Sequence, residues 1–314
     1  MARQQGINIV VLFDFETTYG TSPSAGGYFK LPIISTDLGG NQALIPDDVL
    51  GLGRDPQAPI NDLLRVGGQI TVPLDVRNIG YWLKLLLDDP TTTGSDPYTH
   101  TFVSGSTSLP SAAIEIGHPD VPAFFLLKGV RADSMAITLD RTGKPVAVFN
   151  LVGQNEVKAA TTVDGSPTSL VLTRFNQVQG DIQRNAAALA NVNNASVTYR
   201  NNLEPVETIR ADNLVEDADA GQAAFDGSLS TRFASTTLYD DAVADTPIDL
   251  DLIYTIDASN KLTLAGQEIH LERNKPSVDG SGGISQDFNF QGADDSGEGE
   301  MLEVVLINDV SSYA

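Results

Sequence analysis

The sequence predicts a mainly β protein with two related β-sandwich or β-barrel domains, each carrying a short helix and a long β-hairpin. Three observations lead to this prediction. Thr, Val, Gly, Asp and Asn are abundant, while long helical patterns are scarce. Apolar and polar residues alternate in several short runs, as in half-buried strands. One hairpin pattern returns near the C-terminus, and 314 residues suit two domains of about 100–200 residues each.

The N-terminal quarter predicts short strands separated by one long loop. Residues 7–15 predict a strand or an ordered arm, and residues 28–34 predict a strand. Residues 35–60 contain many Gly, Pro and Asp residues and predict a loop. Loops of this length in a compact domain are usually functional or bound to a partner. Residues 66–74 predict a further strand, in which Pro73 indicates a sheet edge or a bulge.

The clearest helical pattern covers residues 78–89. Asn78 is a suitable N-cap, and Asp88-Asp89-Pro90 ends the pattern. We expect Trp82 to be a core residue, because it belongs to an apolar stripe at helical spacing. The stripe consists of Ile79, Trp82, Leu83, Leu86 and Leu87. Strands are then expected at 99–103, 112–116 and 124–127.

Residues 130–154 predict a β-hairpin. Met135, Ile137 and Leu139 alternate with polar or small residues, and Gly143 lies in a turn-prone stretch between the two runs. The second run, residues 145–152, is apolar on both faces. Such a strand needs cover on both sides, from its own domain or from a neighbouring chain.

A polar, turn-prone stretch at 160–167 marks the expected domain boundary. The first domain is residues 1–160, with an N-terminal arm, and the second is residues 161–314. The second domain is expected to contain strands at 169–175, 195–199, 227–233 and 248–257, a short helix at 236–244, and a solvated loop at 204–226.

The hairpin pattern recurs in the second domain. The block 137–145 resembles 269–276, and Phe149-Asn150-Leu151-Val152-Gly153 resembles Phe288-Asn289-Phe290-Gln291-Gly292. The second hairpin carries a longer Gly- and Ser-rich tip at 277–285. Chance similarity between two hairpins is the alternative. Two matched blocks in the same order favour an internal duplication.

The charge is strongly negative and unevenly distributed. The formal net charge is −22, of which residues 1–200 contribute 14 − 18 = −4 and residues 201–314 contribute 5 − 23 = −18. Such a surface repels DNA, because nucleic acids are bound through positive charge. One interpretation is simple solubility. The sharper interpretation is a surface that nucleic acid must pass without sticking.

The sequence lacks the patterns of common catalytic and metal sites. It has no cysteine, no Gly-Lys-Ser/Thr, no H-E-x-x-H and no G-x-S-x-G. Its three histidines are far apart, and the acidic cluster 294–300 lacks the spacing of an EF-hand calcium loop. We therefore predict a non-enzymatic protein with no cofactor and no metal. Apolar runs are too short for a membrane span or a signal peptide, which predicts a protein made in the cytoplasm without membrane contact.

An ordered set of features resembles the major tail tube proteins of long-tailed, siphovirus-type bacteriophages. The set consists of Glu16-Thr17-Thr18-Tyr19-Gly20, the strand with Gly68 that leads into helix 78–89, Tyr98-Thr99-His100-Thr101-Phe102, the run from Leu109 to Glu115, and the hairpin 130–154. The resemblance covers most of residues 8–155 and, more loosely, the second half.

This resemblance implies two domains of the tail tube type in a structural virion protein. Such a protein self-assembles into stacked rings that form a negatively charged channel for DNA ejection into the host. DNA passes without specific binding. The implied partners are further copies of the chain, the tape-measure protein, and the tail terminator and distal tail proteins. The implied location is the phage tail, after assembly in the host cytoplasm.

If both halves are tube domains, three chains give a ring with pseudo-six-fold symmetry. Asp249, Asp251 and Asp257 share one face of a strand whose other face is apolar, so they are candidates for lining the channel. An outer, solvated face is the alternative. Ring contacts are expected from the arm 1–15, the loop 35–60 and the tips 140–145 and 274–284. The candidate contact residues are Asp140, Arg141, Lys144, Val146, Val148, Arg273, Lys275, Asp47, Asp48 and Arg54.

Two other classes of protein share some of these features. A secreted or surface β-domain adhesin or carbohydrate-binding protein would also be acidic and rich in strands, but the sequence shows no signal peptide. A β-rich hydrolase, metal-dependent or not, would need a catalytic constellation that the sequence does not display.

Overall fold

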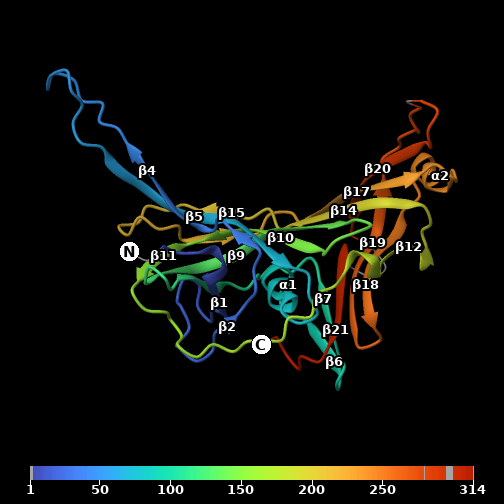
Figure 1. Ribbon diagram of the computed structural model, residues 1–314. Coiled ribbons are helices and arrows are strands. Elements are labelled where there is room, and N and C mark those ends of the chain that lie inside the picture. The colour runs from blue at the N-terminus through green and yellow to red at the C-terminus, as the bar shows by residue number, and fades with distance from the viewer. Residues whose placement is uncertain (1–2, 279, 295–299, 314) are drawn as a thin grey trace.

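The computed structural model describes residues 3–278, 280–294 and 300–313 (Figure 1). Antiparallel strands dominate, which confirms the mainly β prediction. Two α-helices lie within the described residues, α1 (Ile79–Leu87) and α2 (Thr237–Ala244), close to the two ranges predicted as helices.

A long antiparallel sheet of eight strands runs through both halves of the chain. The two halves meet where β9 pairs with β14, with Ile137 opposite Val197. A short strand, β3 (Ser35–Thr36), adds to β5 beside β4. In spatial order the eight strands are β4 (Gly39–Ile45), β5 (Ile60–Pro73), β10 (Val146–Gly153), β9 (Ala123–Leu139), β14 (Val192–Arg200), β17 (Ala224–Arg232), β20 (Ser285–Ala293) and β19 (Asn260–Leu271).

Two of these strands, β9 and β19, are long enough to continue out of the sheet into a second layer. The first part of β9 lies between β8 (Ala112–His118) and β11 (Asn155–Ala159). The first part of β19 lies between β18 (Ile248–Asp257) and β21 (Leu302–Asn308). The layer also contains β1 (Val10–Phe15), β2 (Phe29–Lys30), β6 (Thr91–Gly94), β7 (Tyr98–Val103), β12 (Gly180–Arg184) and β13 (Ala187–Ala188).

Helix α1 lies in the core beneath the long sheet (Figure 1). All of its residues are buried, so it is enclosed rather than covering a sheet with one face. The Trp82 ring centroid lies 5.4 Å from that of Phe13 on β1 and 5.5 Å from that of Phe149 on β10. This confirms Trp82 as a core residue and shows that α1 joins the two layers.

The hairpin predicted at 130–154 is present as β9 and β10, with Ile137 opposite Ala147. On β10, the face carrying Phe149 is buried in the core, and the face carrying Val148 is half-buried. A register shift between Asn150 and Leu151 interrupts the ladder, and bulges of this kind bend a strand. The bend lets β9 leave the sheet for the second layer.

Three sequence predictions are wrong in part. Residues 35–60 are not one loop, because β3, β4 and the first residue of β5 lie there and pair with the sheet. Residues 169–175 form an irregular segment with a single bridge, Arg174 to Asp75, instead of a strand. The segment 204–226 is not a purely solvated loop. It contains β15 (Glu204–Val206), β16 (Asp217–Asp219) and the start of β17.

Candidate assembly interface

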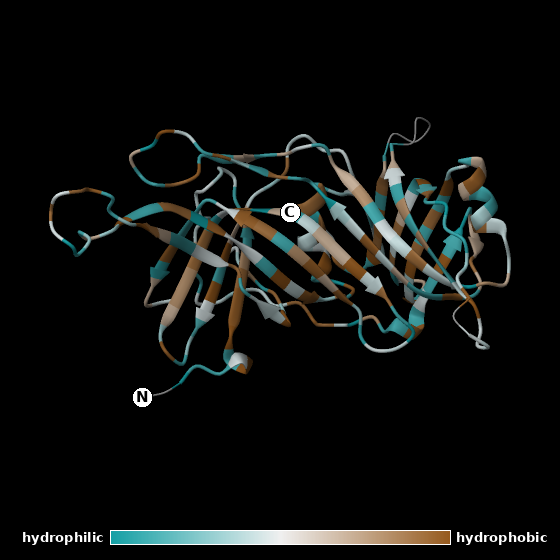
Figure 2. Ribbon diagram, turned by 90° about the horizontal axis from the view of Figure 1, so that it is seen from above, coloured by the Kyte–Doolittle hydropathy of each residue, from teal (hydrophilic) through white to brown (hydrophobic). Residues whose placement is uncertain are grey.

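One face of the long sheet is open and polar. Both ends of the sheet rise on the side opposite α1 (Figure 1). From this side, hydrophilic and hydrophobic residues alternate along the strands (Figure 2). On β20, for example, Phe288 is buried, while Asp287 and Asn289 are exposed. One row across the open face consists of Thr138, Ser196, Ser228 and Asn289, which are opposite one another on adjacent strands.

An acidic stretch of the chain lies over this open face. It belongs to the connection between β14 and β17, residues 201–223, which we call the second connection; β15 stands above the sheet in Figure 1. Glu207 of the second connection pairs with Arg65 on β5 at 2.9 Å, and Asp217 pairs with Arg131 on β9 at 2.6 Å. Val215, 4% exposed, is buried among the residues beneath it. The second connection is therefore fixed to the first half of the chain.

The sheet ends in two edges. Within the described part of the chain, β4 has no strand partner on its outer side, and β19 is paired with β18 there only as far as Ile269. At one end is β4, whose hairpin with β5 projects from the body (Figure 1). Leu50, at the tip, is 93% exposed. At the other end the chain continues past β19 along β20, where the Glu272 N–H donates to the Asn289 carbonyl at 2.8 Å. Unpaired edges are templates for pairing with another chain.

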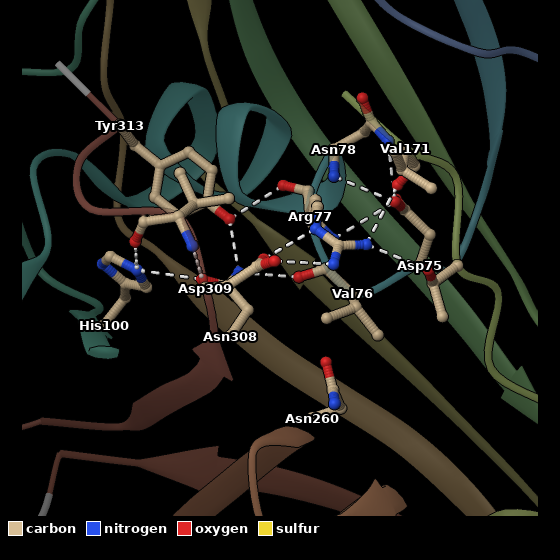
Figure 3. A network of polar contacts seen from close by, with 12 residues as sticks. Asp75, Val76, Arg77, Asn78, His100, Val171, Asn260, Asn308, Asp309 and Tyr313 are labelled. Atoms are coloured by element: carbon tan, nitrogen blue, oxygen red, sulfur yellow. Dashed lines mark hydrogen bonds and ion pairs between the residues drawn. The ribbon is translucent and has the colours of Figure 1, made fainter. Parts of the chain in front are cut away.

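A polar network fastens the C-terminal segment to the start of α1 (Figure 3). The Arg77 guanidinium donates to both carboxylate oxygens of Asp309, at 2.6 and 2.7 Å. This pairing lowers the pKa of Asp309. The Tyr313 hydroxyl donates to the Arg77 carbonyl at 2.8 Å and accepts from the Asn308 amide at 2.6 Å. Gly80 lies against the Tyr313 ring and leaves no room for a side chain.

Asp75 caps α1 from the same network. Its carboxylate accepts from the backbone N–H groups of Arg77, Asn78 and Ile79 and from the Asn78 side chain, at 2.7–3.2 Å. Burial raises the pKa of Asp75, and these hydrogen bonds oppose the rise. The first turn of a helix leaves N–H groups without partners, and Asp75 supplies acceptors for them. The helix cap and the C-terminal segment thus form one hydrogen-bonded junction.

The sequence model of the family described as phage tail tube protein matches residues 6–292. The chain belongs to this family. The match confirms the resemblance, and it favours a structural part of the virion tail over the adhesin and hydrolase alternatives. No curated protein matches the chain. Membership implies self-assembly of the tail tube protein together with other tail proteins.

The described part of this tail tube protein contains no helix long and apolar enough to cross a membrane. Within the same residues, His, Asp and Glu side chains form no group suited to hold a metal ion. Residues 295–299 of the acidic cluster 294–300 lie outside the described residues.

The three aspartates predicted to line the channel lie on β18, which pairs with β12 and β19 and is not one of the eight strands. Asp249 and Asp257 are exposed, while Asp251 is half-buried. Burial, followed by repulsion from Asp249, raises the pKa of Asp251. Their role in the tail tube protein stays a prediction.

The candidate contact residues fall into three groups in the tail tube protein. One group is at the tip of β9–β10, where the Gly143 carbonyl accepts from the Gln177 N–H of the second half. Another follows β19, and a third lies in the projecting β4–β5 hairpin. The members are Asp140, Arg141, Lys144, Val146 and Val148 in the first group, Arg273 and Lys275 in the second, and Asp47, Asp48 and Arg54 in the third.

One signal in the tail tube sequence escaped the sequence analysis. The run Leu44-x-Pro46-x-Asp48-x-Leu50 has the same spacing and chemistry as Leu203-x-Pro205-x-Glu207-x-Ile209. The first run lies in the projecting hairpin and the second in the second connection. The match is easily overlooked, because the second run opens the segment 204–226, whose many acidic residues predict a solvated loop.

Proposed function

We propose that the protein forms the tail tube as stacked rings of three chains, with the open face of the long sheet as the wall of the DNA channel. The observation that carries the proposal is the sheet itself, which runs through both halves and, among the described residues, ends in two unpaired edges. Edge pairing between copies continues the sheet from chain to chain, and closed symmetry removes its free edges.

A duplicated arrangement of strands supports two tube domains, residues 1–160 and 161–314. Phe149 on β10 and Phe288 on β20 occupy corresponding positions. A register shift occurs at Ala112/Ile114 in β8–β9 and at the corresponding place, Ile248/Leu250, in β18–β19. Five strand pairings of the first half have counterparts in the second half. They are, each followed by its counterpart, β5–β10 and β17–β20, β10–β9 and β20–β19, β9–β8 and β19–β18, β8–β1 and β18–β12, and β9–β11 and β19–β21.

The strand pairing refines the sequence repeat. Ile269 is opposite Gly292, which is the counterpart of Gly153. The register of the first hairpin puts Val130 opposite Gly153. Ile269 therefore corresponds to Val130 rather than to Ile137. The block at 149–153 keeps its counterpart at 288–292. With two such domains in each chain, three chains give a ring with pseudo-six-fold symmetry.

The proposed channel wall combines small polar side chains with acidic groups. The row from Thr138 to Asn289 offers hydroxyl and amide groups, and Arg200 on the same face is paired with Asp226 at 2.6 Å. The second connection adds acidic groups, among them Glu207 and Asp217, over this face. A polyanion finds no strong binding site on such a wall and can slide along it.

Electron microscopy of the purified protein at high concentration tests the proposal. The expected result is hollow tubes, with three chains in each ring by symmetry averaging and by mass measurement of isolated rings. Six chains in each ring would overturn the trimer. Monomers at every concentration would overturn the tube.

A further inference from the structure

Each half of the chain contains one long connection between two adjacent strands of the sheet. The first connection, residues 42–64, comprises the outer ends of β4 and β5 and the residues between them. The second connection, residues 201–223, joins β14 and β17. The pairing of β5 with β10 corresponds to that of β17 with β20, and the pairing of β4 with β5 corresponds to that of β14 with β17. In this alignment Gly39 corresponds to Thr198, and Arg65 corresponds to Ala224. The two connections therefore have equal lengths, without insertion or deletion.

The two connections also pair internally in the same way. Ile45 is opposite Ile60 in the first connection, and their counterparts Glu204 and Asp219 are opposite each other in the second. Their placement differs, however. The first connection projects from the body and exposes apolar side chains, while the second connection folds down onto the other half of the chain.

The second connection shows what such a segment contacts. The Leu64 N–H donates to the Asn213 carbonyl at 3.2 Å, and Arg131 pairs with Asp217. Ala218 is buried, with 4% of its surface exposed. Val66, Gly67, Val152 and Gly153 on β5 and β10 line the same cavity as Val215 and Ala218 of the second connection.

None of the described segments folds over the corresponding surface of the second half. By register, the counterparts of Gly67 and Val152 are Asp226 and Gln291. Both line an open cavity of about 650 Å³, together with Ser228, His270 and Glu272. Hydrogen bonds to Glu268 and Asp245 raise the pKa of His270 on this surface.

We propose that a second copy of this chain covers this surface with its first connection, and that its β4 pairs with residues 272–276. The proposal rests on the proposed ring. Inside the chain, β14 pairs with β9 in the same way, with Arg200 opposite Ser134. The contact between chains repeats the contact between halves.

The register of the proposed pairing follows from the neighbouring strand. Ser134 is opposite Asn150, whose counterpart is Asn289. The Glu272 N–H donates to the Asn289 carbonyl, so Glu272 takes the place of Ser134 opposite this strand. Counted from Ile269, Glu272 comes one residue early, because the register shift in β9–β10 has no counterpart in β19–β20. On the other strand of the pairing, Asn41 of β4 takes the place of Arg200 of β14. Asn41 of one copy therefore lies opposite Glu272 of the next.

Disulfide crosslinking tests this register, and the chain has no cysteine of its own to interfere. Directly opposed strand residues have Cα atoms about 4.5–5.5 Å apart, within the range that a disulfide spans. We expect N41C/E272C tubes, after mild oxidation, to give covalent dimers and trimers on non-reducing gels. Both positions are exposed in the single chain, so the substitutions leave its fold intact.

Three controls accompany the variant. A136C/T198C crosslinks within one chain and shows that oxidation is complete, because these residues are opposite each other on β9 and β14. N41C/K275C is displaced by about 10 Å along the strand and gives no crosslink. Tubes assembled from a mixture of N41C chains and E272C chains give covalent dimers only, because each chain then carries a single cysteine.

The results separate this inference from the proposed function. Intact tubes without N41C/E272C crosslinks, or with equally strong N41C/K275C crosslinks, would overturn the pairing and leave the tube unaffected. A wild-type protein that forms no tubes would overturn the proposed function, whatever the crosslinks.

Discussion

Asp75 fixes the start of α1 from inside the protein. Its carboxylate accepts three backbone N–H groups and one side-chain amide, and it is fully buried. Replacing it by alanine leaves the N–H groups of Asn78 and Ile79 buried without an acceptor. Buried donors without acceptors cost about 1–3 kcal/mol.

We expect D75A to lower the free energy of unfolding of the monomer by about 1–3 kcal/mol, measured by urea denaturation. The matched control is D55A, an exposed aspartate in the first connection, with an expected change within about 0.5 kcal/mol. Equal stability of D75A and D55A would contradict the capping role.

This capping arrangement depends on residues that a local sequence pattern does not reveal. The helix and its buried Trp82 were predicted from periodicity, which is a local property. Asn78 was predicted as the N-cap, but its side chain makes no cap hydrogen bond and donates to Asp75 instead. The partners of Arg77 and Gly80, Asp309 and Tyr313, are far away in sequence, so no local pattern reveals them.

At the scale of elements, the first connection is the segment on which assembly depends most directly. Replacing residues 47–58 by an Asn-Gly turn keeps β4 paired with β5 and removes the projecting tip. We expect the shortened chain to fold, as judged by circular dichroism and an unchanged unfolding midpoint, but to form no tubes in electron microscopy. The tip is exposed in the single chain, so its removal costs the monomer little.

A second variant separates length from chemistry. In this variant, residues 47–58 are replaced by a Gly/Ser segment of equal length. We expect the same loss of tubes, because the proposed contact requires the side chains of the first connection. Tubes of normal length from both variants would show that the tip contributes nothing to assembly.

Elements were predictable from the sequence where pairing is local. The alternation in residues 130–154 predicted β9 and β10, because a hairpin pairs neighbouring segments. The continuation of β9 into the second layer and the placement of the second connection depend on contacts between distant segments. The acidity of residues 204–219 correctly indicated exposure, but it concealed Val215 and Ala218, which anchor the segment.

At the scale of the whole molecule, two surfaces compete as the channel wall. The sequence analysis predicted the face of β18 that carries Asp249 and Asp251. The fold instead favours the open face of the long sheet, because this sheet ends in the two edges that lack a partner among the described residues and continues through the proposed ring. Lysine substitutions distinguish the two surfaces, since each substitution recurs in every chain along the tube.

We expect T138K/S196K virions to assemble normally and to eject DNA more slowly at low salt, with recovery at high salt. Lysines on the wall would bind DNA phosphates, and such contacts weaken at high salt because salt screens the charges. D249K/D251K virions should eject at the wild-type rate, because β18 lies outside the sheet that forms the wall. The measurement is the time course of DNA release at two salt concentrations. Slow ejection in D249K/D251K with a normal rate in T138K/S196K would instead place the channel along β18.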